Sequence, residues 1–186
     1  MPKKTTTQTN KKDRSNRVKE NFSELDELRR ENRELREMVD RLSIDPSYGI
    51  LTRQALELEV SLRKKEFNKL AFLDVDYLHD FNENHGHEEA NNRIRRALHF
   101  RSTDLAGIGN RVTGKYYSGD EVAILFDGDP EGFCKRQEEA FESEGMSITI
   151  AWVEFTGNFD KAVKAAKKIV FEKKGYRTEK RAILMG

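Results

Sequence analysis

The sequence predicts an α+β domain with a mainly antiparallel central sheet, preceded by a long coiled-coil helix. Short runs of apolar, β-branched and aromatic residues, typical of strands, recur from residue 69 onward and alternate with helical patterns. The predicted order is strand, two helices, two strands, helix, strand, helix and strand. This order favours an antiparallel sheet with helices on one side. Upstream, residues 17–43 carry a heptad pattern.

Composition limits the classes of protein to consider. The 186 residues suit one domain plus an extension, and 36% of them are charged. No apolar run approaches the roughly 20 residues of a membrane span, and the polar N-terminus carries no secretory signal. A single cysteine, Cys134, fits a reducing compartment. We therefore expect a cytoplasmic protein, and the net charge of +1 gives no reason to expect membrane or nucleic-acid partners.

The N-terminal region divides into a tail and a dimerisation helix. Residues 1–16 are polar, lysine-rich and without periodicity, so we expect a disordered basic tail. In residues 17–43, leucines and valines at the a and d heptad positions favour a parallel two-stranded coiled coil, and Asn32 at an a position fixes its register. We predict a homodimer through residues 17–43; the alternative is one amphipathic helix packed on the domain. The a and d residues are Val18, Leu25, Asn32, Val39, Asn21, Leu28, Leu35 and Leu42.

The domain itself is predicted over residues 44–186. Asp45-Pro46 ends the first helix and begins a turn. Thr52 caps a helix to Lys65, whose expected inner face is Ala55, Leu58 (or Leu56) and Leu62. The later elements are strand 69–75, helices 77–84 and 87–101 separated at Gly86, loop 102–110, strands 112–117 and 121–126, a helix from Asp129-Pro130 to Ser143, strand 146–155, a helix from Asn158 to Lys173, and edge strand 181–185.

Two acidic pairs stand at strand ends. Asp74 and Asp76 follow a buried strand, and Asp120 and Glu121 follow a tight Ser118-Gly119 turn. If the two strands are neighbours, Asp74, Asp120 and Glu121 converge, and clustered carboxylates repel one another unless a cation lies among them. Oxygen ligands suit Mg²⁺ (or Mn²⁺), which leaves open positions for phosphate oxygens. The pattern therefore points to metal-assisted nucleotidyl transfer.

These residues carry a resemblance to a known family. Ser118-Gly119-Asp120-Glu121-Val122 resembles the GGDEF signature of diguanylate cyclases in a variant form. The segment 72–76, followed by Asn82 and by Gly86-His87, is similar to that family's first strand and next helix, and 45–53 resembles the segment that opens its domain. The resemblance covers residues 44–186 and implies a ferredoxin-like palm.

The resemblance implies a reaction and the residues that perform it. Two GTP molecules, one on each domain of a dimer, condense into cyclic di-GMP. Asp74, the Val75 carbonyl and Asp120 hold Mg²⁺, with Glu121 as a further ligand or a group near the attacking hydroxyl. Two cations bridge the phosphates. The Ser118-Gly119 turn lets the backbone lie close to the nucleotide.

Several positions depart from the family pattern. Asn82 and Asn91 match the two base-reading positions, the second of which is normally Asp. Because Asn suits adenine better than a carboxylate does, we expect a weaker preference for GTP, with ATP as an alternative substrate. His79 replaces a phosphate-contacting Lys. Lys173 and Arg177 are assigned to phosphates because the segment 169–173 is loosely similar to the motif of the family's final helix. The inhibitory Arg-x-x-Asp site is replaced by Gly109 and Val112, so product feedback there is not expected.

Two rival interpretations remain open. In the first, the domain is catalytically inactive and serves as a nucleotide-binding or dimeric scaffold module, which the altered phosphate contacts favour. The retained carboxylates favour catalysis, because buried carboxylates are costly without a cation. In the second, zinc binds among His79, His85, His87 and His99, although no cysteine lies near them. A run of lysines in the last helix, Lys161, Lys164, Lys167 and Lys168, is interpreted as a solvated face.

Overall fold

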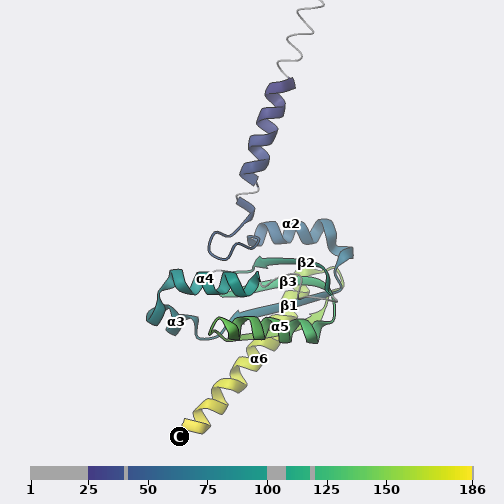
Figure 1. Ribbon diagram of the computed structural model, residues 1–186. Helices are drawn as coiled ribbons and strands as arrows, with labels where there is room; N and C mark the ends of the chain where they lie inside the picture. The colour runs from purple at the N-terminus through teal and green to yellow at the C-terminus, as the bar shows by residue number, and fades with distance from the viewer. Residues whose placement is uncertain (1–24, 40–41, 100–107, 118–119, 186) are drawn as a thin grey trace, which may run out of the picture. The chain divides into compact units, whose positions relative to one another are not determined.

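The computed structural model describes residues 25–39, 42–99, 108–117 and 120–185, of which 108, 109 and 176–185 are described by backbone only (Figure 1). The chain divides into two compact units, Met1–Leu42 and Ser43–Gly186. The predicted tail, residues 1–16, lies outside the described residues. So does the predicted loop 102–110 as far as residue 107.

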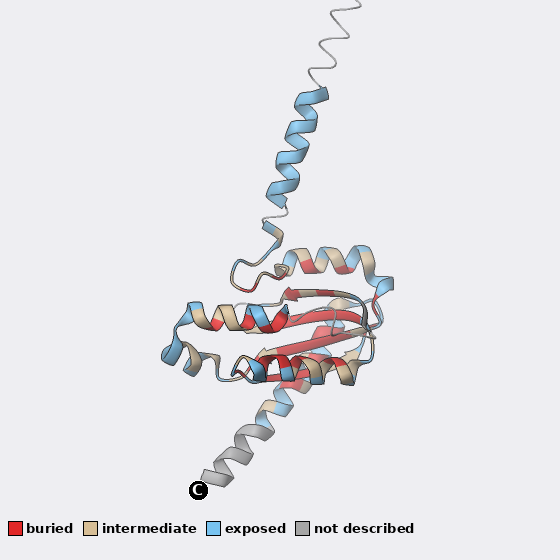
Figure 2. Ribbon diagram, in the orientation of Figure 1, coloured by how far each residue is buried: buried red, intermediate tan, exposed pale blue. Residues whose placement is uncertain are grey.

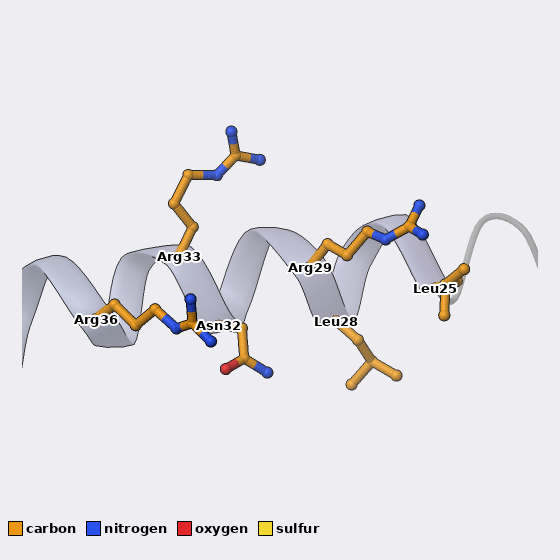
Figure 3. A pocket seen from close by; sticks show the side chains of 6 residues that line it. All are labelled: Leu25, Leu28, Arg29, Asn32, Arg33 and Arg36. Atoms are coloured by element: carbon orange, nitrogen blue, oxygen red, sulfur yellow. The ribbon is translucent and has the colours of Figure 1, made fainter.

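In the first unit, residues 25–39 form a helix, in agreement with the prediction for this part of 17–43. Its apolar side chains are exposed: Leu28 by 52%, Leu35 by 58% and Val39 by 59%. Leu28 and Asn32 point to the same side of the helix, beside a hollow that Leu25, Arg29, Arg33 and Arg36 also line (Figure 3). These three residues of the heptad seam are thus each more than half exposed.

The second unit is built on one antiparallel sheet. Its four strands are β1 (Lys69–Val75), β2 (Ile108–Lys115), β3 (Glu121–Gly128) and β4 (Ile148–Glu154). They lie in the order β2-β3-β1-β4, and each neighbouring pair is antiparallel. Strand β1 was predicted at these bounds, and the hairpin strand before the turn starts four residues earlier than expected. The two central strands, β1 and β3, each have a neighbour on both sides.

Helices cover both faces of the sheet (Figures 1 and 2), so the expectation of helices on one side was wrong. Helices α4 (His87–Leu98) and α5 (Pro130–Ser143) share one apolar core with Leu73 and Ile124. Helices α2 (Arg53–Arg63) and α6 (Phe159–Met185) share another with Leu70 and Phe72. The physical reason is the run 70–73 of β1, where every side chain is buried, because a strand apolar on both faces needs a layer on each.

Local signals place the helix starts where the sequence predicted them. Thr52 caps α2 by accepting from the Ala55 N–H, and Asp129 caps α5 by accepting from the Glu131 and Gly132 N–H groups. Asn158 Oδ1 accepts from the Lys161 N–H at 3.0 Å at the start of α6. Gly86, at φ 85°, separates α3 (Leu78–His85) from α4. Side chains that satisfy the first N–H groups fix where each helix begins.

Two predictions about helices were wrong. The buried residues of α2 are Leu56 and Val60, whereas Leu58 and Leu62 are 58% and 72% exposed. Leu58 and Leu56 were predicted as alternatives for one inner position, and Leu56 is the buried one. Residues 181–185 are not an edge strand, because α6 continues to Met185. Strong helix formers across residues 176–185 and no proline leave the helix without a stop signal.

None of the helices among the described residues is both long enough and apolar enough to cross a membrane.

Candidate functional site

An acidic cluster forms at one end of the two central strands. Asp74, near the end of β1, is the Cα partner of Glu121, the first residue of β3. Side chains alternate along a strand, so Asp74 lies on the same face as Leu70 and Phe72, beneath α6. Glu121 shares that face with Ala123 and Leu125 of β3. The register thus brings together two carboxylates that are 47 residues apart in the chain.

Asp120 joins this pair. The pKa of Asp74 is raised to about 6, chiefly because burial disfavours the charged form. A hydrogen bond from Lys174 acts in the opposite direction, and the Asp120 carboxylate, within hydrogen-bonding reach, raises the pKa further. The carboxyl groups of Asp74 and Asp120 therefore meet at one end of the sheet, and Glu121 lies opposite Asp74 on the neighbouring strand. Their crowding is an electrostatic cost that a cation would relieve.

Two lysines of α6 contact the cluster. Lys174 Nζ donates to Asp74 Oδ1 and lies 3.5 Å from Asp76 Oδ1, while Lys167 Nζ donates to Glu121 Oε1. Their spacing of seven residues is close to two helical turns, so both reach down from one face of α6. All of these side chains are largely buried; Glu121 is 13% exposed and Asp74 15%.

One oxygen of the cluster stays without a partner among the described residues. Glu121 Oε2 is buried and accepts no hydrogen bond there, whereas Asp76 Oδ1 accepts from Thr149 Oγ1 at 2.7 Å. A buried, unpaired carboxylate oxygen costs free energy unless a ligand satisfies it. Oε2 of Glu121 is therefore the atom of this cluster most in need of a further positive charge.

The donor set fits a hard cation that has few protein ligands. The clustered groups offer oxygen ligands only, which suits Mg²⁺ or Mn²⁺. Across the described ranges, no group of three or more His, Cys, Asp or Glu side chains is arranged to hold a metal ion by itself. Mg²⁺ is usually held by one or two carboxylates together with phosphate oxygens and water. The carboxylates thus suit a cation whose remaining ligands are phosphate oxygens and water.

The two residues assigned to the base lie on neighbouring helices, Asn82 on α3 and Asn91 on α4. Asn91 lines a surface hollow together with Asn92 and Arg95. The opening segment forms part of the same hollow through Pro46 and Ser47. Arg95 fixes that segment, because its guanidinium donates to the Pro46 and Ser47 carbonyls at 2.5 and 3.0 Å. Asn82 lies partly buried on α3.

Neither Lys173 nor His79, the described residues predicted to contact phosphates, lies against the acidic cluster. Lys173 Nζ donates to the Ile150 carbonyl at 2.7 Å, so its neighbour Lys174 is the lysine that reaches the carboxylates. His79 is exposed, with its Nε2 3.3 Å from Glu83 Oε1, and does not contact the cluster. Val75 ends β1 and pairs with Ile148 of β4. Ser118, Gly119 and the side chain of Arg177 lie outside the described residues.

Sequence reasoning missed the two lysines of the site. Lys167 had been interpreted as part of a solvated face, and that was wrong, because its side chain is only 29% exposed. Lys168 does lie on the solvated face, at 78% exposed. The available signal was the spacing of Lys167 and Lys174, which places both on the face of α6 that also carries the buried residues Val163 and Val170.

The comparisons with known proteins agree on the fold. No protein-family model matches the chain, and no curated protein matches it by sequence. Among solved structures, the coiled coil and GGDEF domain of DgcB from Caulobacter crescentus in complex with c-di-GMP is similar, with a TM-score of 0.62 and 17% identity over 86% of this chain and 93% of that one.

Two further structures extend the comparison. The diguanylate cyclase SiaD from Pseudomonas aeruginosa, in complex with its activator SiaC, has a TM-score of 0.56 and 17% identity over 90% of this chain and 72% of that one. A diguanylate cyclase/phosphodiesterase from Caldicellulosiruptor saccharolyticus has a TM-score of 0.58 and 16% identity over 74% of this chain and 91% of that one. The chain thus has the fold of GGDEF domains, as its motifs predicted.

Proposed function

We propose that this GGDEF-fold protein is a divalent-cation-dependent nucleotidyltransferase. It joins two purine nucleoside triphosphates, GTP first among them, into a cyclic dinucleotide such as cyclic di-GMP. The observation that carries the proposal is the contact of the Asp74 and Asp120 carboxyl groups at one end of two neighbouring strands, with Glu121 opposite Asp74 in the register of those strands. Oxygen ligands gathered at a sheet end suit the charge of a metal-bound triphosphate.

Three side chains and one carbonyl would hold the cation: Asp74, Asp120, Glu121 and the carbonyl of Val75. When bound, a divalent cation neutralises phosphate charge and lowers the pKa of the attacking 3′-hydroxyl. Glu121 Oε2, buried and without a partner among the described residues, is the oxygen best placed by its environment to accept that charge. Mg²⁺ and Mn²⁺ both suit this set.

Lys174 is the residue that we assign to the phosphates. Its ammonium already lies within reach of Asp74 and Asp76, at the entrance to the cluster. An ammonium has three N–H donors, so it can retain one carboxylate contact while it donates to a phosphate oxygen. Lys173, the residue expected in this role, is turned toward the Ile150 carbonyl instead.

We assign the base to the hollow that Asn91 lines. Asn82, on the neighbouring helix, is the second base-reading residue. An amide at position 91 offers one acceptor and one donor, which suits adenine as well as guanine. The protein is therefore expected to accept ATP alongside GTP, with less discrimination than a carboxylate at this position would give.

Dimerisation through residues 17–43 would serve catalysis. Each domain binds one nucleotide, so two half-sites must meet before either hydroxyl can attack. A permanent coiled coil raises the effective concentration of one half-site near the other. Exposed Leu28, Leu35 and Val39, together with Asn32 on the same seam, support pairing of this helix with a second copy.

The test is turnover by the purified full chain. With Mg²⁺ present, we expect GTP, alone or mixed with ATP, to yield a cyclic dinucleotide identified by mass spectrometry. Asp120→Ala should abolish the product, and omission of the metal should do the same. Product formation that survives Asp120→Ala, or that needs no divalent cation, would contradict the proposal.

A second candidate is a nucleotide-binding module without turnover. It is favoured by the pairing of Lys167 with Glu121 and of Lys174 with Asp74, since each carboxylate then already has a cation. On this alternative, nucleotide binds with equal affinity in the presence and absence of Mg²⁺, and no product forms. Measuring both binding and product in the same samples separates the two functions.

A further inference from the structure

Lys167 lies inside the acidic cluster as a fixed positive charge. Its ammonium donates to Glu121 Oε1, and the two side chains are 29% and 13% exposed. Lys164, one turn earlier on α6, is exposed to solvent, whereas Lys167, like Lys174, lies on the face of the helix that contacts the carboxylates. An ion pair of this burial is far less screened by solvent than a surface pair.

Aromatic rings enclose the same ammonium. The Nζ atom of Lys167 lies 5.3 Å from the ring centroid of Tyr117, 5.8 Å from that of Phe72 and 5.9 Å from that of Phe171. Rings at this range attract a cation through their negative faces. The ammonium is therefore paired with Glu121 and lies within about 6 Å of rings from β1, the hairpin and α6.

The charges of the cluster leave room for one divalent ion. Four carboxylates, those of Asp74, Asp76, Asp120 and Glu121, face two ammonium groups, those of Lys167 and Lys174. Counted over these six described side chains, the formal excess is two negative charges, which a single divalent cation balances. The lack of any metal-holding group of three ligands among the described residues agrees with a site that is partly occupied by lysine.

We propose that Lys167 takes the place of one of the two metal ions used by nucleotidyl-transfer sites of the two-metal type. A single divalent cation then accompanies the nucleotide on each chain. This inference rests on the proposed function and differs from the two cations that the resemblance implies. Lys167 is here a positioning residue: it engages Oε1 of Glu121 and leaves Oε2 for the one cation.

The experiment counts metal ions. Equilibrium dialysis of the full-length protein against Mn²⁺ and saturating α,β-methylene GTP, with bound nucleotide counted in the same cell, gives the number of Mn²⁺ ions per bound nucleotide. A parallel arm uses the adenine counterpart. We expect one Mn²⁺ per nucleotide for the native chain and two for Lys167→Met, which keeps the length of the side chain and removes its charge.

Control variants separate charge from structure. Lys164→Met removes a charge from the exposed face of the same helix and should leave the count at one. Lys167→Arg keeps the charge and should also bind one ion, so it tests the inference even if Lys167→Met does not fold. Circular dichroism reports folding of each variant.

Each outcome is decisive. Two ions on the native chain or on Lys167→Arg, or one ion on folded Lys167→Met, would overturn the inference while leaving the proposed function intact. No Mn²⁺ bound with the nucleotide would overturn both.

Discussion

Leu56 of α2 fills the space that a side chain at position 114 of β2 would need. A Cβ atom built on Gly114 would lie 2.7 Å from Leu56 Cβ and 2.9 Å from its Cδ2. Both residues are buried, so neither has solvent to move into. The close approach sets how α2 lies on the sheet and which of its leucines faces inward.

Gly114→Ala is therefore expected to destabilise the domain. Overpacking of a well-filled core costs roughly 1–3 kcal/mol, because neighbouring atoms must shift or leave their rotamers. Urea unfolding followed by circular dichroism measures the change. Gly175→Ala is the matched control: it lies in helix α6 with nothing within 4 Å of the added carbon, and should be neutral or stabilising. Equal effects at the two positions would contradict the packing argument.

Asp74 should give the metal-free protein a distinct dependence on pH. Its carboxyl binds a proton more tightly in the folded chain, where the pKa is about 6, than at the ordinary value of 3.8. The stabilisation is therefore complete below pH 3.8 and is lost as the pH rises through 6. The free energy of unfolding of the native chain, minus that of Asp74→Asn, should fall across this window in EDTA. A difference that stays constant or rises would contradict the shift.

Asn91→Asp is expected to sharpen the choice of base. A carboxylate accepts from both guanine N1–H and the 2-amino group, and a bidentate pair is worth roughly 1–3 kcal/mol of discrimination. We expect the ratio of GTP to ATP affinity to rise about tenfold, measured by competition binding. Asn92→Asp, which adds the same charge in the same hollow, is the control. An equal rise in both variants would mean that charge alone is responsible.

Leu35→Asp should dissociate the proposed dimer. A charge at a d position of the seam has no partner and would be buried on pairing. Sedimentation equilibrium of the full chain should show a dimer for the native sequence and a monomer for this variant. Glu34→Ala, on the neighbouring exposed position of the same helix, should stay dimeric. A native chain that sediments as a monomer would refute dimerisation through this helix.

The sequence predicted most of the fold because its strongest signals are local. The uninterrupted apolar run of residues 70–73 marks β1, and polar caps at Thr52, Asp129 and Asn158 mark three helix starts. Where a pattern admitted two solutions, sequence alone could not decide. In α2, leucines occur at 56, 58 and 62, and only the packing of Leu56 against Gly114 selects among them. The apolar residues 182–185 are likewise too short a run to separate helix from strand.

The sequence pointed to the acidic residues of the candidate site, but it did not identify the lysines that pair with them. Asp74, Asp120 and Glu121 can be recognised in the sequence because each lies directly beside an apolar run that is typical of a buried strand. Their partners lie 46 and 100 residues further along, at Lys167 and Lys174, among many other lysines of the same helix. Which lysine turns inward depends on how α6 is rotated on the sheet. That rotation follows from packing, which no short stretch of sequence encodes.

The position of β1 between β3 and β4 has a consequence for how this protein tolerates change. The strand that carries Asp74 is hydrogen-bonded along both sides, so it cannot slide without breaking two ladders at once. Exposed positions of the outer strands β2 and β4 can therefore change while Asp74 and Glu121 stay opposite each other in the ladder.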